Sequence, residues 1–260
     1  ESPRWLLGRG GGRNKARRIL SRIGGDNFAD AEIAAIERSF DGDTRQPVRK
    51  ILMEKGVVRL LVLGIVLAVF QQWCGINVIF NYAQEVFANA GYSVSETLFN
   101  IVVTGSVNLA FTFIGMFTVD RLGRKSLMLF GAGGLALIYG IMGLMYYLKL
   151  QGLPLLIMVV TAIACYAMTL APVTWVLLSE IFPNRIRGFA MSVGTFALWT
   201  ACFILTYTFP LLNKSFGASG TFWLYGLICV MGFWFILKKL PETKGKSLEE
   251  IEWENGRGRK

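Results

Sequence analysis

Four side-chain amides gather in the middle of one long apolar run. Gln71, Gln72, Asn77 and Asn81 lie close together around Gly75. On an ideal helix of 3.6 residues per turn, Gln71, Asn77 and Asn81 fall within an arc of about 120°. Gln72 lies off that arc, but Gly75 can loosen the turn and let it swing in. Uncharged amides on one face offer both hydrogen-bond donors and acceptors, which is the chemistry that a polyhydroxyl solute requires.

The alternative is that these amides hold helices together. An unpaired amide in hydrocarbon costs several kcal/mol, so each needs a partner. A hydrogen bond between helices contributes about 1–2 kcal/mol or less. One amide would favour this structural role, whereas four clustered amides favour a binding site. Asn108, in the next apolar run, is a fifth candidate and is equally compatible with packing.

Two tryptophans are further candidates for binding. Trp175 follows Pro172, whose ring interrupts a helical hydrogen bond and favours a bend. An indole at a bend can stack on a sugar ring and donate one hydrogen bond. It can also anchor a helix at the membrane interface. Trp199 is compatible with either role.

Charged residues form a second group, at the loops between apolar runs. Opposite charges at helix ends can pair and hold one side of a helix bundle closed. The alternative is that they are topology signals and solvated ion pairs, worth under about 1 kcal/mol each. The candidates for a gate are Asp120, Arg121, Arg124, Glu180, Arg187 and Glu242.

The elements that position these residues are membrane spans. The 260 residues are 53% hydrophobic, with a mean hydropathy of +0.48. A helix needs roughly 20 mostly apolar residues to cross about 30 Å of hydrocarbon. Six runs satisfy this condition, at 57–82, 97–119, 127–148, 153–178, 190–212 and 221–237. The sequence therefore predicts an all-α membrane protein.

The basic residues predict the orientation of the spans. Of the 27 Lys and Arg residues, 25 lie in segments that alternate spans place on one side, and only Lys149 and Lys214 lie in the other loops. The positive-inside rule makes the basic side cytoplasmic, so both ends of this chain are expected there. No basic face with interleaved aromatic residues supports nucleic-acid binding, despite a net charge of +10.

Metal and acid–base chemistry find little support in the composition. There is no His, and the four cysteines lie singly within apolar runs without metal-ligand spacing. We predict no metal, no cofactor and no enzymatic activity. No carboxylate lies at the middle of a span, because Glu85 and Glu96 lie near the outer surface and Glu180 near the inner one. This chain by itself is not expected to carry a proton relay.

Three regions follow from these patterns. Residues 1–56 are expected to form a cytoplasmic linker of short amphipathic helices, separated by Gly24-Gly25 and by residues 41–47, the third helix covering 48–55. Residues 57–240 form the six-helix domain, and 241–260 a cytoplasmic tail. The chain has no initiator Met, and similar turns precede and follow the six spans. We therefore expect a duplicated six-span unit of which this is the second copy.

Taken together, the motifs resemble those of sugar porters of the major facilitator superfamily. They are ESPR at 1–4, QQWCGIN at 71–77, DRLGRK at 120–125, PVTW at 172–175, EIFP at 180–183 and PETKG at 241–245. The resemblance covers essentially the whole chain, and it is strongest to bacterial xylose–proton symporters. It implies the C-terminal half of a twelve-helix fold, whose partner is the N-terminal six-helix half.

The resemblance also implies roles for individual residues. Sugar binding is implied for Gln71, Gln72, Asn77, Asn108, Trp175 and Trp199, and inner gating for Asp120, Arg121, Arg124, Glu180 and Arg187. There are two departures. Asn81-Tyr82 stands where the family commonly has Tyr-Tyr or Phe-Tyr, which alters the outer lid. Leu198 stands where xylose carriers have Gln, which removes one hydrogen-bonding group and leaves the identity of the sugar open. The family's proton-coupling Asp lies outside this chain.

The expected function is monosaccharide transport in a bacterial inner or plasma membrane, coupled to protons, by alternating access. Passive facilitation is the first alternative, and an intramembrane Asp in the first span of the other half would separate the two. A non-transporting sugar sensor is the second. Sensors of this kind usually carry a long signalling tail, and only about twenty residues follow Pro241.

Overall fold

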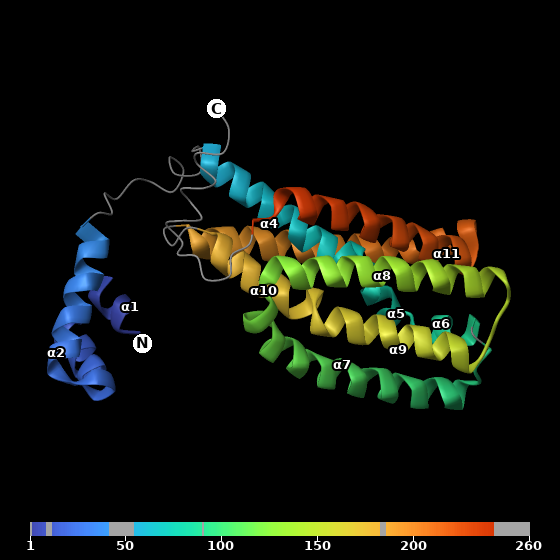
Figure 1. Cartoon of the computed structure of the whole chain (residues 1–260), viewed down its shortest axis with the longest axis horizontal. Coiled ribbons are helices and arrows are strands. Elements are labelled where there is room, and N and C mark those ends of the chain that lie inside the picture. The colour runs from blue at the N-terminus through green and yellow to red at the C-terminus, as the bar shows by residue number, and fades with distance from the viewer. Residues whose placement is uncertain (1, 9–11, 42–54, 90, 183–185, 242–260) are drawn as a thin grey trace. The chain divides into compact units, whose positions relative to one another are not determined.

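The computed structural model describes residues 2–8, 12–41, 55–89, 91–182 and 186–241, and every regular element in these ranges is a helix. The chain divides into two compact units, Glu1–Met53 and Glu54–Lys260. Figure 1 shows the helices of each unit in chain order. The all-α membrane class predicted from the apolar runs is confirmed.

The first unit consists of α1 (Pro3–Gly8) and α2 (Arg13–Asp41). Gly25 interrupts α2, because its φ of 83° and ψ of 176° are not helical. Glycine reaches this conformation without a steric penalty, so the predicted separation of two helices at Gly24-Gly25 is confirmed. Arg17 and Asp30 pair across the interruption, with Nε to Oδ1 at 2.7 Å and Nη2 to Oδ2 at 2.8 Å.

A small apolar core holds this unit together. Leu20, Ala29 and Ile33 are buried against one another, and Leu7 of α1 packs on them. The core therefore joins α1 to both halves of α2. The third helix predicted for the linker, at 48–55, lies outside the described residues except for Lys55, where the next helix begins.

The second unit contains the membrane spans. Its helices are α4 (Lys55–Trp73), α5 (Ile76–Asn81), α6 (Ala83–Asn89), α7 (Val94–Leu122), α8 (Arg124–Tyr147), α9 (Leu153–Met168), α10 (Leu170–Ile181) and α11 (Arg187–Lys239). Five stretches are long and apolar enough to cross a membrane: Gly56–Asn81, α7, α8, Leu153–Ile181 and α11. The first and fourth of these each consist of two helices end to end.

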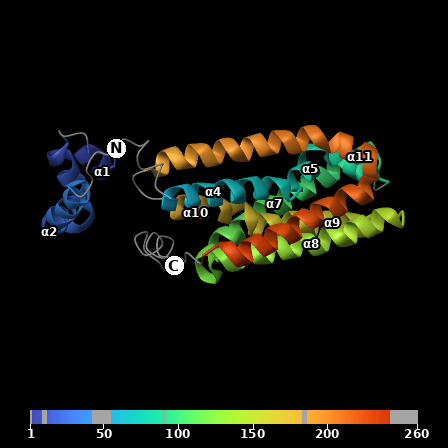
Figure 2. The ribbon, with the colours of Figure 1, turned by 90° about the horizontal axis from the view of Figure 1, so that it is seen from above.

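The last stretch supplies two spans. Its 53 residues would measure about 80 Å as one helix, far more than a bilayer core. Gly217, with φ of 67° and ψ of 176°, divides it. Figures 1 and 2 show that the chain reverses within α11, so that its second part runs back along the bundle. Among the described residues, six segments of a length and composition suited to crossing a membrane result, as the apolar runs predict.

Helix α7 lies at the edge of this unit, and only 11% of its most apolar window is buried. Its contacts are mainly with α9. At Gly115 a Cβ atom would lie 2.7 Å from the carbonyl oxygen of Met168, so glycine permits the close approach. Phe99, Phe113 and Phe117 are 69%, 55% and 76% exposed. Much of the helix thus offers an apolar surface to lipid or to another protein segment.

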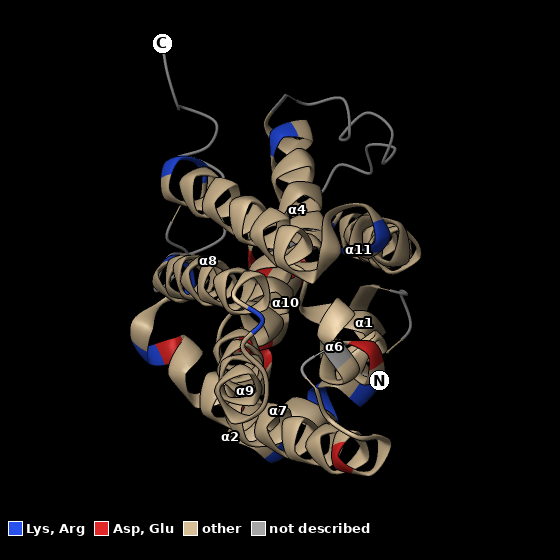
Figure 3. Ribbon diagram, turned by 90° about the vertical axis from the view of Figure 1, so that its right-hand side faces the viewer, with Lys and Arg blue, Asp and Glu red and all other residues tan. Residues whose placement is uncertain are grey.

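Charged residues avoid the middle of the spans. Seen along the bundle in Figure 3, the helices are mostly free of charged residues. Between Lys125 and Lys149, and between Leu150 and Ser179, no Asp, Glu, Lys or Arg occurs. The polar side chains within the bundle are therefore uncharged, and amides, hydroxyls and indoles carry its chemistry.

Candidate functional site

The first span breaks at the position where the amides gather. Helix α4 ends at Trp73 and α5 begins at Ile76, with Gly75 between them in the left-handed region at φ 89°. Ordinary residues are strained in this region, and glycine is not. A Cβ at Gly75 would also lie 2.6 Å from Cγ of Tyr225, so the turn rests directly on that ring. The loosening of the helix expected at Gly75 is confirmed.

The break lets three amides and one phenol form a continuous chain of hydrogen bonds. Gln71 Nε2 donates to the hydroxyl of Tyr166 at 2.8 Å, and Gln72 Nε2 donates to Gln71 Oε1 at 2.8 Å. Asn77 Nδ2 donates to Gln72 Oε1. We call Asn77, Gln72, Gln71 and Tyr166 the amide relay. Gln72, which lies off the face in an unbroken helix, is thereby drawn in.

Burial makes these hydrogen bonds consequential. Gln71 and Gln72 are 4% and 5% exposed, and Tyr166 is 8% exposed. An amide buried this deeply without a partner would be strongly destabilising. Sequence reasoning missed Tyr166, which stands in the otherwise apolar span of α9. The signal that could have identified it is the hydroxyl itself, because a buried tyrosine hydroxyl usually has a hydrogen-bond partner.

Asn81 lies one turn further along and contacts another helix. Its Nδ2 donates to Oγ1 of Thr206 in α11 at 3.3 Å. The hydroxyl of Tyr82 donates to the carbonyl oxygen of the same Thr206 at 2.9 Å, and its ring lies 4.6 Å from that of Phe209. These contacts fasten α5 to the first part of α11. Asn81 is therefore not a member of the amide relay, and Thr206 is a polar partner that the sequence did not single out.

The other binding candidates do not join the relay. Asn108 is half-buried in α7, and its backbone carbonyl accepts a hydrogen bond from Oγ1 of Thr112 at 2.7 Å. Trp175 and Trp199 are 39% and 62% exposed, whereas the neighbouring Leu198 is 1% exposed. Among the described residues, no hydrogen bond links Asn108 or either indole to the amides.

The bend expected near Pro172 lies earlier in the chain than Trp175. Helix α9 ends at Met168 and α10 begins at Leu170, with Thr169 at φ −119° and ψ −87° between them. Proline has no N–H for the carbonyl four residues before it, and its ring crowds that carbonyl. The helix therefore breaks near Met168, and Trp175 lies inside the continuous helix α10. The prediction of a bend is confirmed, but its position at the indole is wrong.

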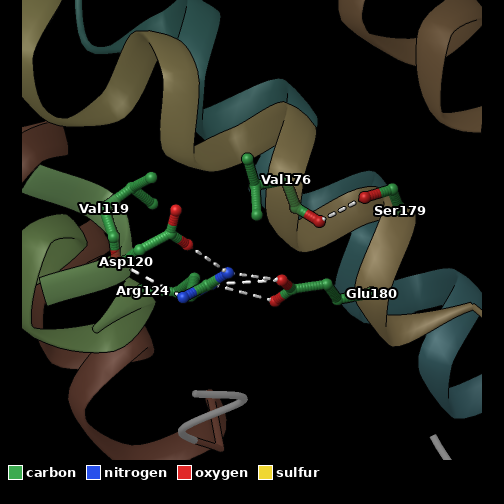
Figure 4. Close-up of polar contacts among 6 residues, drawn as sticks. All are labelled: Val119, Asp120, Arg124, Val176, Ser179 and Glu180. Atoms are coloured by element: carbon green, nitrogen blue, oxygen red, sulfur yellow. Dashed lines mark hydrogen bonds and ion pairs between the residues drawn. The ribbon is translucent and has the colours of Figure 1, made fainter. Parts of the chain in front are cut away.

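A charge cluster joins the ends of α7, α8 and α10 (Figure 4). Arg124 donates to Glu180 three times, from Nη2 at 2.8 Å and from Nε to both carboxylate oxygens at 3.1 Å. Its Nη2 also contacts Oδ1 of Asp120 at 3.0 Å. The side chains of Arg124, Glu180 and Asp120 are 12%, 28% and 76% exposed. We call these three residues the inner charge cluster.

The remaining gate candidates are placed differently. Arg187 Nε donates to the carbonyl oxygen of Phe182 at 3.3 Å, so its guanidinium spans the turn between α10 and α11. Arg121 is exposed in the last turn of α7. Glu242 lies outside the described residues.

The comparisons with known proteins decide the family. The family model described as "Sugar (and other) transporter" matches residues 1–254. The chain belongs to this family. It is an integral membrane protein of the sugar porter group in the major facilitator superfamily, and its relatives are named as transporters.

Several relatives align with nearly all of this sugar porter chain. It is 39% identical over 262 residues to the D-xylose-proton symporter of Escherichia coli, and the alignment covers 98% of this chain and 52% of the relative. It is 36% identical over 253 residues to the arabinose-proton symporter of Bacillus subtilis, with 97% and 54% covered. A facilitated trehalose transporter of Aedes aegypti is 36% identical over 264 residues, with 97% and 32% covered.

Solved structures agree with this relationship. The proton:xylose symporter XylE bound to 6-bromo-6-deoxy-D-glucose matches with a TM-score of 0.82 at 39% identity, over 97% of this chain and 54% of that one. An inward-open structure of the xylose transporter from E. coli matches with a TM-score of 0.70 at 37% identity, over 97% and 51%. The chain thus spans about half the length of its bacterial relatives and about a third of the Aedes transporter.

Proposed function

We propose that this chain forms half of a carrier that moves a monosaccharide across a membrane by alternating access, with a proton as co-substrate. The observation that carries the proposal is the amide relay. Three amides and a phenol meet at a broken membrane helix, where unsatisfied polar groups are costly. Amides and hydroxyls that already satisfy one another can exchange partners with the hydroxyl groups of a sugar at little net cost.

The partner of this chain in the proposal is a preceding six-helix half. The exposed apolar face of α7 supports this, because a surface of this kind needs either lipid or protein against it. Asn108, Trp175 and Trp199 lie outside the relay and retain exposed surface. We assign them to the wall that faces the other half, where sugar would reach them, while Asn81 holds α5 at the edge of the site.

The inner charge cluster serves as the cytoplasmic gate in this proposal. Arg124 joins α8 to α7 and α10 through Asp120 and Glu180, so separating these helices requires breaking its contacts. We assign Arg187 and Arg121 to the same gate, and we propose that the linker of residues 1–56 and the tail of residues 241–260 are cytoplasmic. The distribution of Lys and Arg supports a cytoplasmic location for both ends.

Proton coupling rests on the named relatives. The E. coli and B. subtilis relatives are symporters and the Aedes relative is a facilitator. No Asp or Glu of the described spans lies near their middle, so a titrating group would belong to the other half. Dependence of D-xylose uptake on an imposed proton gradient supports symport, whereas uptake that only follows the sugar gradient supports facilitation.

The site is tested by uptake of labelled D-xylose into proteoliposomes that contain the complete carrier. We expect Gln72→Ala and Asn77→Ala to abolish saturable uptake, because each removes a donor and an acceptor from the relay. Gln84→Ala is the matched control, since this amide is exposed on α6 and makes no contact with the relay. Competition by pentoses, hexoses, myo-inositol and trehalose identifies the preferred solute.

Membrane insertion of each variant is measured by its yield and by its elution as a single species in detergent. Normal uptake in both Gln72→Ala and Asn77→Ala would refute the site. Loss of uptake in Gln84→Ala as well would show that the loss is not specific to the amide relay, and it would remove the support for the site.

A further inference from the structure

The hydrogen bonds of the amide relay all run in one direction. Asn77 donates to Gln72, Gln72 donates to Gln71, and Gln71 donates to Tyr166. Gln72 Oε1 accepts from Asn77, and Gln71 Oε1 accepts from Gln72. The amide nitrogen of Gln72 therefore faces Gln71, and that of Gln71 faces Tyr166. The two ends therefore differ: Asn77 presents its carbonyl oxygen, and Tyr166 presents the proton of its hydroxyl.

Tyr166 stands where two helix breaks meet. Gln71 lies in the last turn of α4, just before the break at Gly75, and Tyr166 lies in the last turn of α9, just before Thr169. The backbone carbonyl of Tyr166 accepts from the N–H of Thr169 at 3.1 Å. Tyr166 is 8% exposed, and its hydroxyl is carried by a rigid ring, so the oxygen keeps one position beside Gln71.

We propose that Tyr166 is a positioning residue of the sugar site, whose hydroxyl holds the Gln71 side chain against α9. A phenol hydroxyl can donate or accept, so it can hold the Gln71 amide in place in either orientation of that amide. Gln72 and Asn77 are held in turn through Gln71. The relay thus keeps its amides at fixed positions for the sugar.

Disorder in the relay weakens the apparent affinity of the carrier for sugar. Without the phenol oxygen, the Gln71 side chain loses its partner on α9, and only a fraction of molecules holds it in the competent position. The apparent Kd rises by the inverse of that fraction. We expect Tyr166→Phe to weaken D-xylose binding about tenfold, the size typical of one buried hydrogen bond left unmade.

The inference rests on the proposed function, and equilibrium binding of D-xylose to the complete carrier in detergent tests both. Tyr166→Phe is measured alone and in a Gln71→Ala background. Because Tyr166 acts through Gln71, we expect the tenfold loss in the first case and less than a twofold change in the second. Tyr146→Phe is the matched control, since the hydroxyl of Tyr146 donates to the carbonyl oxygen of Val86 at 3.1 Å, away from the relay.

The outcomes separate the two proposals. If Gln71→Ala weakens binding but Tyr166→Phe does not, or if Tyr166→Phe costs the same in both backgrounds, Tyr166 has no positioning role and the sugar site stands. If no substitution of Gln71, Gln72 or Asn77 alters binding, the site itself is wrong. 4-Fluorophenylalanine at position 166 replaces the hydroxyl by a group of similar size that is a poor acceptor, and it must give the same loss should Tyr166→Phe insert poorly.

Discussion

Replacing Glu180 by Gln should open the inner side of the carrier. The substitution keeps the size of the side chain and one acceptor, but it removes the charge that Arg124 contacts at 2.8 Å. At an effective dielectric constant of about 20, two unit charges at this distance attract by about 6 kcal/mol. Most of this is offset by the desolvation of both groups, because Arg124 and Glu180 are only 12% and 28% exposed.

The net loss lies between two limits. Exposed pairs contribute about 0–1 kcal/mol, and breaking a buried pair costs about 3–5 kcal/mol. We take about 2 kcal/mol for this partly buried pair, which corresponds to a shift of about thirtyfold toward the open state if the pair exists only when the inner side is closed. Asp120→Asn is a matched control on the same guanidinium. Its carboxylate is 76% exposed, so we expect less than a twofold shift.

Hydrogen–deuterium exchange of the complete carrier in lipid nanodiscs measures the shift. Backbone amides at the ends of α7 and α10 should exchange about thirtyfold faster in Glu180→Gln than in the parent, with little change in Asp120→Asn. Equal exchange in the two variants would show that burial does not decide the strength of these contacts. Unchanged exchange in Glu180→Gln would remove the inner charge cluster from the gate.

Three further outcomes follow from the structure. Gly75→Ala should lower stability by about 2–3 kcal/mol, because a φ of 89° and a Cβ 2.6 Å from the Tyr225 ring are both unfavourable. Gly105→Ala is the control: its Cβ would meet nothing within 4 Å, so the melting temperature should stay unchanged or rise. The hydrogen bond from Arg17 lowers the pKa of Asp30. The Arg17–Asp30 pair should therefore stabilise α2 fully at neutral pH and lose that effect as the pH falls through the lowered pKa. Hydrogen-exchange rates at residues 13–41 in the parent and in Asp30→Asn should converge in acid. Arg187→Ala should slow the exchange of labelled D-xylose across the membrane more than it weakens equilibrium binding, and a selective loss of affinity would place Arg187 in the site instead.

The membrane class could be predicted because it depends on local composition. Long apolar runs bury their backbone polar groups only as helices, whatever their neighbours are. The breaks at Gly25 and Gly75 were also predictable, because glycine at each position adopts a positive φ that other residues avoid. Gly217 shows the same property, and it divides α11 into two spans where the apolar runs separate.

The partners of individual side chains were less predictable. Tyr166 lies 95 residues from Gln71, and Thr206 lies 125 residues from Asn81. Contacts over such separations depend on which helices pack together and on their rotation about their axes. The bend near Pro172 was expected at Trp175 and occurs at Thr169, because the missing N–H of a proline acts on the carbonyl one turn earlier.

By itself, the sequence determined that six helices cross a membrane and that uncharged amides gather within the first of them, because hydrophobicity and residue type are local properties. Tertiary structure decided that these amides form one chain of hydrogen bonds ending on Tyr166, and that Arg124 pairs with the partly buried Glu180. A hydrogen bond forms only where donor and acceptor meet within about 3 Å. That distance between residues far apart in the chain is a property of the packed bundle.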